Sequence, residues 1–321
     1  MELVLFKTTA AKGRQRTLRW PDGKLTDIET IGKAVNIQVA EGHATPVTLE
    51  VAEFEPIDGD VLTRDWFADG VRHTLAVKCF AIKDISVATK AYKQNIREAS
   101  GDIRFFERAL NTEDRFLEIF NTAIHSEGHL VQKALELWAA CWFNSTSTYI
   151  VGENRLGQLP YDETYQDPGK VPISLVMSHQ INLIIIEHES MLLQDITRGF
   201  EANQPINETF DILYVFTFIL LQIAYLSIKR DEKYARKHRT QFARPETIPK
   251  YINTATVIRD HLRLFAEKQA TPNITDRMET INKVYAEIIA AGGAPFSTDG
   301  RENGEGVEAA DEVVPGKVGE V

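Results

Sequence analysis

The feature that most constrains the fold is a stretch around residues 134–143 that has helical spacing and is hydrophobic nearly all round. One stripe of this stretch, at steps of three or four residues, carries Val131, Leu135, Trp138 and Trp142. The neighbouring faces carry Ala134, Leu137, Ala140 and Cys141. A helix that is hydrophobic nearly all round is buried on all sides. The stretch therefore predicts a large helical core.

The chain up to residue 82 has the pattern of strands. Residues 35–39 and 47–51 alternate apolar and polar side chains with a period of two, as half-buried strands do. Two more apolar runs, 61–67 and 71–77, flank Ala68-Asp-Gly70, a short turn that predicts a hairpin.

Beyond residue 82 the period is that of helices, and we predict helices over residues 84–99, 102–125, 129–143, 173–199, 207–230, 247–268 and 275–290. The glycine- and proline-rich segment 152–172 is predicted to be a loop that divides the helical part. The predicted fold class is α+β, predominantly α. It has a small β-rich N-terminal subdomain (1–82), a helical domain (83–291) and a disordered acidic C-terminal tail (292–321).

The net charge of −10 is unevenly distributed along the chain. From Gly292 onward seven acidic and two basic residues give the tail a net charge of −5, which leaves −5 for the rest. The tail is rich in glycine and poor in aromatic residues, so it cannot bury enough apolar surface to offset the entropy of ordering. We expect it to be a solvating tail.

The N-terminus has the opposite charge, and its cations are Lys7, Lys12, Arg14, Arg16 and Arg19. This run is typical of a solvated leader or strand flank, and the alternative is a targeting or nucleic-acid-binding arm. Its short apolar run precedes the basic residues, which is the reverse of a secretory signal.

Residues 210–228 are long and apolar enough to cross a bilayer by length alone. Asp211 and Gln222 lie within them, and Asn207 and Glu208 before them are suited to a helix N-terminus. Lys229, Arg230 and Lys233 follow, so the charge order complements a helix dipole. A central core helix is favoured over a membrane span.

The two cysteines, Cys79 and Cys141, support neither a disulfide framework nor a multi-cysteine metal site. This cysteine usage fits a reducing intracellular compartment. Nucleophile elbows, phosphate-binding loops and dinucleotide fingerprints do not occur in the sequence. We therefore expect no catalytic residues, no cofactor and no metal.

Two pairs of histidines are candidate metal ligands. His125 and His129 are four residues apart, but Gly128 lies between them, so a junction between two helices is favoured over a metal site. His179 and His188 are nine residues apart and need not face the same way. We expect solvated or capping histidines at both of these positions.

The strongest cationic segment, 229–239, holds six Lys or Arg in eleven residues. It predicts either a solvated helix end, with Asp231 and Glu232 between the cations, or a nuclear-import signal or phosphate-contacting patch. The residues concerned are Lys229, Arg230, Lys233, Arg236, Lys237 and Arg239.

An ordered series of segments resembles the regulatory, C-terminal region of fungal zinc-cluster transcription factors. The series comprises residues 54–62 with Arg64 and Trp66, 80–82, 134–142, the Gly152 to Gly157 turn, 171–172, 180–186, 230–237 and 242–246. Such factors read DNA with a six-cysteine module that binds two zinc ions. Cys79 and Cys141 cannot form such a module, because it requires several closely spaced cysteines.

The resemblance implies a transcription regulator, nuclear rather than cytoplasmic, that acts through protein contacts. The partners expected are a second copy or a zinc-cluster factor, and no membrane. DNA binding is expected only if a zinc cluster is supplied by a missing N-terminus or by a partner. The alternative is an enzyme with an unrecognised pocket, in which a metal-dependent site would involve His125 and His129.

Overall fold

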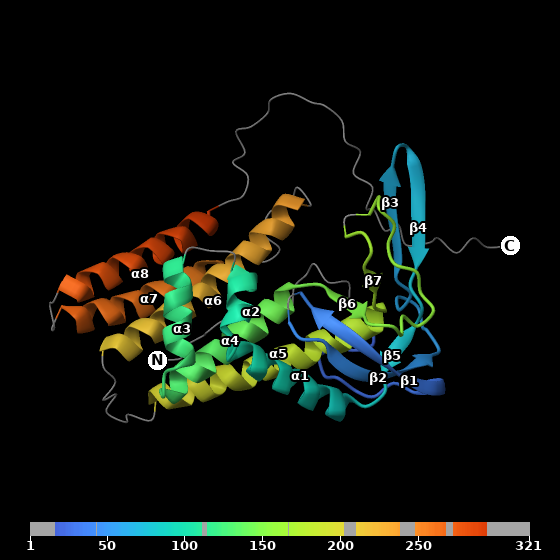
Figure 1. The fold of residues 1–321 in the computed structure, drawn as a ribbon, viewed down its shortest axis with the longest axis horizontal. Helices are drawn as coiled ribbons and strands as arrows, with labels where there is room; N and C mark the ends of the chain where they lie inside the picture. The colour runs from blue at the N-terminus through green and yellow to red at the C-terminus, as the bar shows by residue number, and fades with distance from the viewer. Residues whose placement is uncertain are drawn as a thin grey trace.

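The fold is taken from a computed structural model of the 321-residue chain (Figure 1). The structure describes residues 17–42, 44–110, 114–165, 167–201, 210–237, 248–267 and 272–293. The tail beyond Gly293 and the cations Lys7, Lys12, Arg14 and Arg16 lie outside these residues. The fold class is the predicted one, an N-terminal sheet followed by a predominantly helical region.

The main sheet has five antiparallel strands in the order β5-β2-β1-β6-β7. Their bounds are β1 Thr30–Glu41, β2 Val47–Phe54, β5 Phe80–Ile82, β6 Thr148–Val151 and β7 Val171–Pro172. The predicted alternation is observed: Ile37 and Val39 of β1 and Leu49 and Val51 of β2 are buried, with exposed residues between them. The apolar face of the sheet therefore packs on the helices.

The hairpin β3 (Thr63–Ala68) and β4 (Val71–Ala76) is confirmed. Asp69 and Gly70 form its turn with φ values of 50° and 77°, the left-handed backbone that a two-residue hairpin loop requires. Trp66 anchors one face, because its ring packs edge-on against Tyr165 and its Nε1 donates to Thr164 Oγ1 at 2.6 Å.

The prediction of an unbroken loop over residues 152–172 is wrong at its end, because β7 pairs with β6, which follows the apolar helix and pairs with β1. Strand β7 is only two residues long, so it leaves no period-two pattern in the sequence. The division of the chain at residue 82 stays a prediction. The sheet nevertheless takes strands from both sides of that position.

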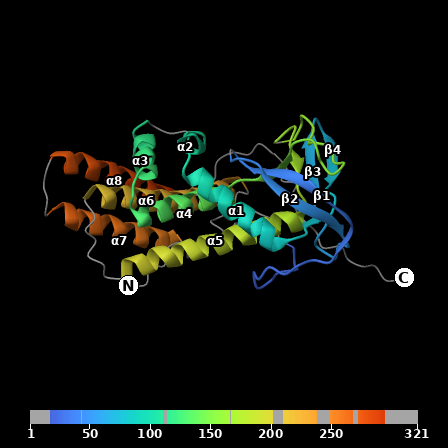
Figure 2. The same cartoon turned by 60° about the horizontal axis from the view of Figure 1, so that its bottom comes forward.

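Within the described residues there are eight helices. Their bounds are α1 Ile85–Ser100, α2 Ile103–Leu110, α3 Asp114–Ile124, α4 His129–Ser145, α5 Leu175–Glu201, α6 Phe210–Lys237, α7 Ile248–Ala266 and α8 Pro272–Ala291. The sheet and hairpin lie at one end of an elongated molecule and α6, α7 and α8 at the other (Figure 1). Helix α5 runs from the sheet into the helical end (Figure 2).

The predicted all-round burial of the apolar stretch is confirmed in α4. Every residue from Ala134 to Asn144 is buried, because α4 contacts α1, α3, α5 and α6. Trp138 is fully buried among the rings of Phe105, Phe106 and Phe120.

The single helix predicted over residues 102–125 is wrong, because α2 and α3 are separate helices. The rings of Phe106 and Phe120 stack with their centroids 4.5 Å apart. In one continuous helix these residues would lie about 21 Å apart along the axis. The break lets both rings pack on Trp138, a tertiary reason that the local period does not contain.

Helix α6 supports the prediction of a core helix. In the described part of the chain it is the one helix that is long and apolar enough to cross a membrane, over Phe210–Lys229. In the most apolar window 78% of the residues are buried inside the protein, against α3, α4, α7 and α8. The predicted N-cap Asn207 and the predicted first-turn residue Glu208 lie outside the described residues.

Candidate functional site

The basic segment predicted as an import signal or phosphate-contacting patch lies at the C-terminal end of α6. The helix runs to Lys237 and so includes five of the six candidates: Lys229, Arg230, Lys233, Arg236 and Lys237. Arg239 lies outside the described residues, as does the 242–246 segment of the resemblance.

Lys229 is the one member of this set whose side chain the structure describes. Its Nζ lies 2.8 Å from Glu232 Oε2, and both Asp231 and Glu232 are 8% exposed. The acidic residues within the segment therefore point into the protein rather than alternating with the cations in solvent. The function of the basic segment stays a prediction.

The first histidine pair lies at a junction between helices, as predicted. Helix α3 ends at Ile124, and Gly128 is the N-cap of α4, which begins at His129. His125 Nδ1 lies 2.8 Å from the carbonyl oxygen of Asn121. His125 also lines a shallow surface cavity of about 380 Å³ with Asp211 and Val215. Within the described ranges, no three His, Cys, Asp or Glu side chains are grouped so that they could hold a metal ion.

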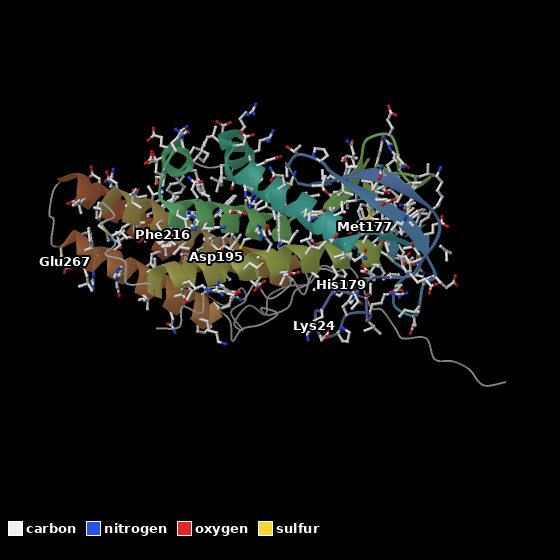
Figure 3. The ribbon with its side chains drawn as sticks, turned by 90° about the horizontal axis from the view of Figure 1, so that it is seen from below. Lys24, Met177, His179, Asp195, Phe216 and Glu267 are labelled. Carbon is white, nitrogen blue, oxygen red and sulfur yellow. The ribbon has the colours of Figure 1, made fainter. Side chains whose placement is uncertain are left out.

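The prediction of solvated or capping histidines at His179 and His188 is wrong, because both side chains are buried within helix α5. His179 and His188 are 3% and 5% exposed. Figure 3 labels His179 on α5, at the end of the helix that lies near Lys24. The ring of His179 contacts the ring of Trp20 edge-on at 5.3 Å. Helix α5 is buried on several faces, so helical spacing alone could not identify a solvent-facing side.

His188 pairs with Glu136 of α4 in the interior, and the pair is ionic when the imidazole is protonated. Its Nε2 lies 3.0 Å from Glu136 Oε1, and each side chain is 7% exposed. Because a carboxylate can only accept, Nε2 carries the proton and donates. Arg97 of α1 and Lys133 of α4 lie 3.9 Å from the same carboxyl group. Glu136 therefore joins α4 to α5 through His188 and to α1 through Arg97.

The charges around Glu136 keep it ionised. Burial by itself raises the pKa of a carboxyl group. The hydrogen bond and charge of His188, together with the charges of Lys133 and Arg97, outweigh this effect and lower the pKa of Glu136 below its ordinary value.

A second buried carboxylate, Glu41, lies where β1 ends. Thr148 Oγ1 of β6 donates to Glu41 Oε1 at 2.5 Å, and the hydroxyl of Tyr92 on α1 lies 3.3 Å from the same atom. Asn144 Nδ2 of α4 donates to Glu189 Oε1 of α5 at 3.3 Å. These contacts connect the sheet to α1 and α4 to α5.

Helix α5 also hydrogen-bonds to the edge strand β5. The side chain of Gln180 binds both backbone groups of Ile82, accepting from its N at 2.8 Å and donating to its O at 3.3 Å. Ser174 Oγ donates to the carbonyl oxygen of Phe80. The Gln180 contact joins segments 80–82 and 180–186, which both carry the resemblance described above.

The segment before β1 is held by a buried ion pair. Arg19 Nε donates to Asp60 Oδ2 at 2.8 Å, and the Asp60 side chain is fully buried. Arg19 is therefore not a free cation of a basic arm. Sequence reasoning missed both ion pairs, although Glu136 is visible as the one charged residue between Ala134 and Phe143.

The polar contacts of these residues thus join helices to one another and helices to the sheet. Residues 6–285 match the family model of the KpeA transcription factor. A comparison with curated proteins and a comparison with solved structures each found no match. The matched region covers the sheet, the hairpin and all but the end of the last helix. The chain belongs to the KpeA transcription factor family.

Proposed function

We propose that this chain is the regulatory region of a fungal zinc-cluster type transcription factor and works through protein contacts, without being an enzyme. The observation that carries the proposal is the family match over residues 6–285, which includes both the sheet and the helical part. The ordered series of segments that resembles zinc-cluster regulators supports the finer assignment. Two of these segments, 80–82 and 180–186, lie where α5 meets the sheet.

Sequence-specific DNA binding belongs, in this proposal, to a zinc cluster supplied by a missing N-terminus or by a partner. Cys79 is half-buried and Cys141 is buried on α4. Two cysteines placed in this way cannot form a binuclear zinc cluster. The partner is a second copy of the chain or a zinc-cluster factor.

The proposed location is the nucleus, with the basic end of α6 acting as the import signal. Its cations lie on a helix that continues beyond the apolar Phe210–Lys229 segment. Clusters of Lys and Arg of this length are typical of import signals.

The regulatory function is tested by tethering the chain to a heterologous DNA-binding domain in a fungal reporter strain. We expect reporter transcription to change relative to the DNA-binding domain alone. The Trp138→Ala variant, which removes a fully buried ring, is the matched negative control. Reporter output that is the same for the wild-type fusion, the Trp138→Ala fusion and the bare domain contradicts the proposal.

Nuclear import is tested by the triple variant Arg236→Gln, Lys237→Gln, Arg239→Gln, fused to a fluorescent protein. The matched control replaces Lys33, Lys90 and Lys250, which are exposed elsewhere on the surface, by Gln. We expect nuclear fluorescence to fall for the first variant only. Equal nuclear signal in both variants would show that the basic end of α6 is not the import signal.

A further inference from the structure

Helices α6 and α8 lie side by side and run in the same direction (Figure 1). Near their starts, Arg277 of α8 pairs with Asp211 of α6, and its guanidinium lies 5.2 Å from the centroid of the Tyr214 ring. Further along both helices, burial raises the pKa of the Tyr225 hydroxyl on α6, and the nearby charge of Glu287 on α8 raises it further. The C-terminal ends of the two helices therefore lie at the same end of the helical part.

The chain leaves α8 beside the basic end of α6, which we define as residues 229–239. The Nζ atom of Lys229 lies 5.8 Å from the centroid of the Tyr225 ring, so the basic end begins close to the level of Glu287. Gly292 is five residues beyond Glu287, which is about 7.5 Å along the helix axis. The same rise from Tyr225 reaches residue 230, inside the basic end.

Close packing fixes the place where α8 ends. A Cβ atom at Gly292 would lie 2.8 Å from the side chain of Ile252 and 3.1 Å from that of Ile248. Ile248 is the first residue of α7, and residues 238–247 connect it to Lys237, where α6 ends. The chain beyond α8 therefore starts against the first turn of α7, one short connection away from the basic end.

The chain beyond Gly293 and the basic end carry opposite charges. Six Lys or Arg and two acidic residues give the basic end a charge of +4, whereas seven acidic and two basic residues give residues 294–321 a charge of −5. From Asp299 to Asp311 a carboxylate recurs at every third residue. The six residues from Gly293 to Asp299 span about 20 Å when extended, and the helical part of the basic end is about 12 Å long. The carboxylates can therefore reach the cations, and their regular spacing favours no single register.

We propose that the acidic tail, residues 294–321, binds the basic end of α6 within the same chain and shields its cations from the import receptor. Charge complementarity and the place where the tail starts carry the proposal, and acidic terminal segments are often interaction segments. Ion pairs between exposed groups contribute little individually, so the contact is sensitive to salt and adds little to the stability of the fold. The shielding of an import signal rests on the proposed function, whereas the contact itself does not.

The contact is tested by carbodiimide coupling in the purified full chain, which joins a lysine amine to a carboxylate that it touches. Coupled peptides are identified by mass spectrometry. We expect carboxylates of the tail to couple to Lys233 and Lys237, and this coupling to be lost in 1 M NaCl, where the screening length is about 3 Å. The internal controls are Lys33 and Lys90, which are exposed outside the basic end.

Two results would overturn the contact. The first is a coupling yield at Lys33 and Lys90 equal to that at Lys233 and Lys237, or no coupling of the tail to the basic end. The second is coupling that joins different chains in a mixture of isotope-labelled and unlabelled protein, because the proposed contact lies within one chain.

A matched pair of variants separates shielding from a change in net charge. One variant replaces five carboxylates of the tail by their amides: Asp299, Glu302, Glu305, Glu308 and Asp311. The control replaces five exposed acidic residues elsewhere in the same way: Asp27, Glu53, Asp58, Glu118 and Glu187. Fused to a fluorescent protein, the tail variant should raise the nuclear signal about twofold, because exposed ion pairs are weak. The control should leave the signal unchanged.

An equal nuclear signal in the tail variant and its control overturns the shielding. The coupling yield is measured without reference to import, and the import signal itself is tested by the triple variant of Arg236, Lys237 and Arg239 described above. Failure of the contact is therefore distinguishable from failure of the proposed import signal.

Discussion

At the scale of single residues, buried polar side chains specify how the helices and strands meet. Glu136 is 5% exposed within a helix whose other inner positions are mostly apolar. Removing one member of a buried ion pair leaves the other without compensation, which costs more than the pair itself contributes. His188, Arg97 and Lys133 all contact this one carboxylate.

We expect the Glu136→Gln substitution to lower the free energy of unfolding at pH 7 by about 1–3 kcal/mol. The pKa of Glu136 is lower in the folded chain than its ordinary 4.5, so its contribution is present above that value and is lost as the pH falls through the folded pKa. The difference between wild type and variant should therefore shrink below about pH 5. Urea unfolding at a series of pH values measures it.

The control for this prediction is Glu187→Gln, which changes an exposed carboxylate on α5, one residue from His188. Its effect should remain within about 0.5 kcal/mol at all pH values. Equal effects of the two substitutions at pH 7 would show that the interior ion pair does not stabilise the fold.

At the scale of elements, the close approach of helices and turns depends on small residues. Gly42 follows β1 with a φ of 54°, and a Cβ atom there would lie 2.3 Å from the ring of Trp142. The end of α4 therefore packs directly on the turn that joins β1 to β2. Gly32 has a similar φ of 73°, but no atom lies within 4 Å of its Cβ position.

The Gly42→Ala and Gly32→Ala substitutions separate backbone strain from packing. We expect Gly32→Ala to cost about 1 kcal/mol of unfolding free energy, because only the left-handed backbone opposes it. Gly42→Ala should cost roughly a further 1–3 kcal/mol, because the Trp142 ring has to move. Chemical denaturation of both variants gives the comparison, and equal costs would contradict a tight contact between the turn and α4.

At the scale of the whole molecule, the main core extends from the sheet to the last helix. Residues as distant as Val39 of β1 and Ile288 of α8 belong to this one cluster. The acidic tail beyond Gly293 lies outside the described residues, and the sequence predicts that it does not order. Stability should therefore depend on α8 and not on the chain beyond it.

Deletion of residues 294–321 should leave the free energy of unfolding unchanged within about 0.5 kcal/mol, because the composition of this segment predicts that it does not order. The control deletion begins at residue 280 and also removes Ile281, Val284 and Ile288, which are fully buried. This control should lose cooperative unfolding in a thermal melt. A large loss from the shorter deletion would show that the tail contributes to the fold.

The spacing of apolar residues was sufficient to predict a helix, strand or turn wherever that element's own residues determine its conformation. The hairpin turn at Asp69 and Gly70, the half-buried strands and the all-round apolar helix α4 were predicted, because each pattern reflects a local period or a local backbone requirement. The same reasoning failed at the break between α2 and α3. There the stacking of Phe106 on Phe120 against Trp138 depends on a third helix.

The sequence by itself determined the order of most strands and helices, the burial of α4 and the uneven charge along the chain, because these follow from the spacing and type of neighbouring residues. Only the tertiary structure decided which polar residues are buried together. Glu136 and His188 are 52 positions apart, and Arg19 and Asp60 are 41 positions apart. A partner at such a distance leaves no periodic signal, so these two pairs form only when the chain is folded.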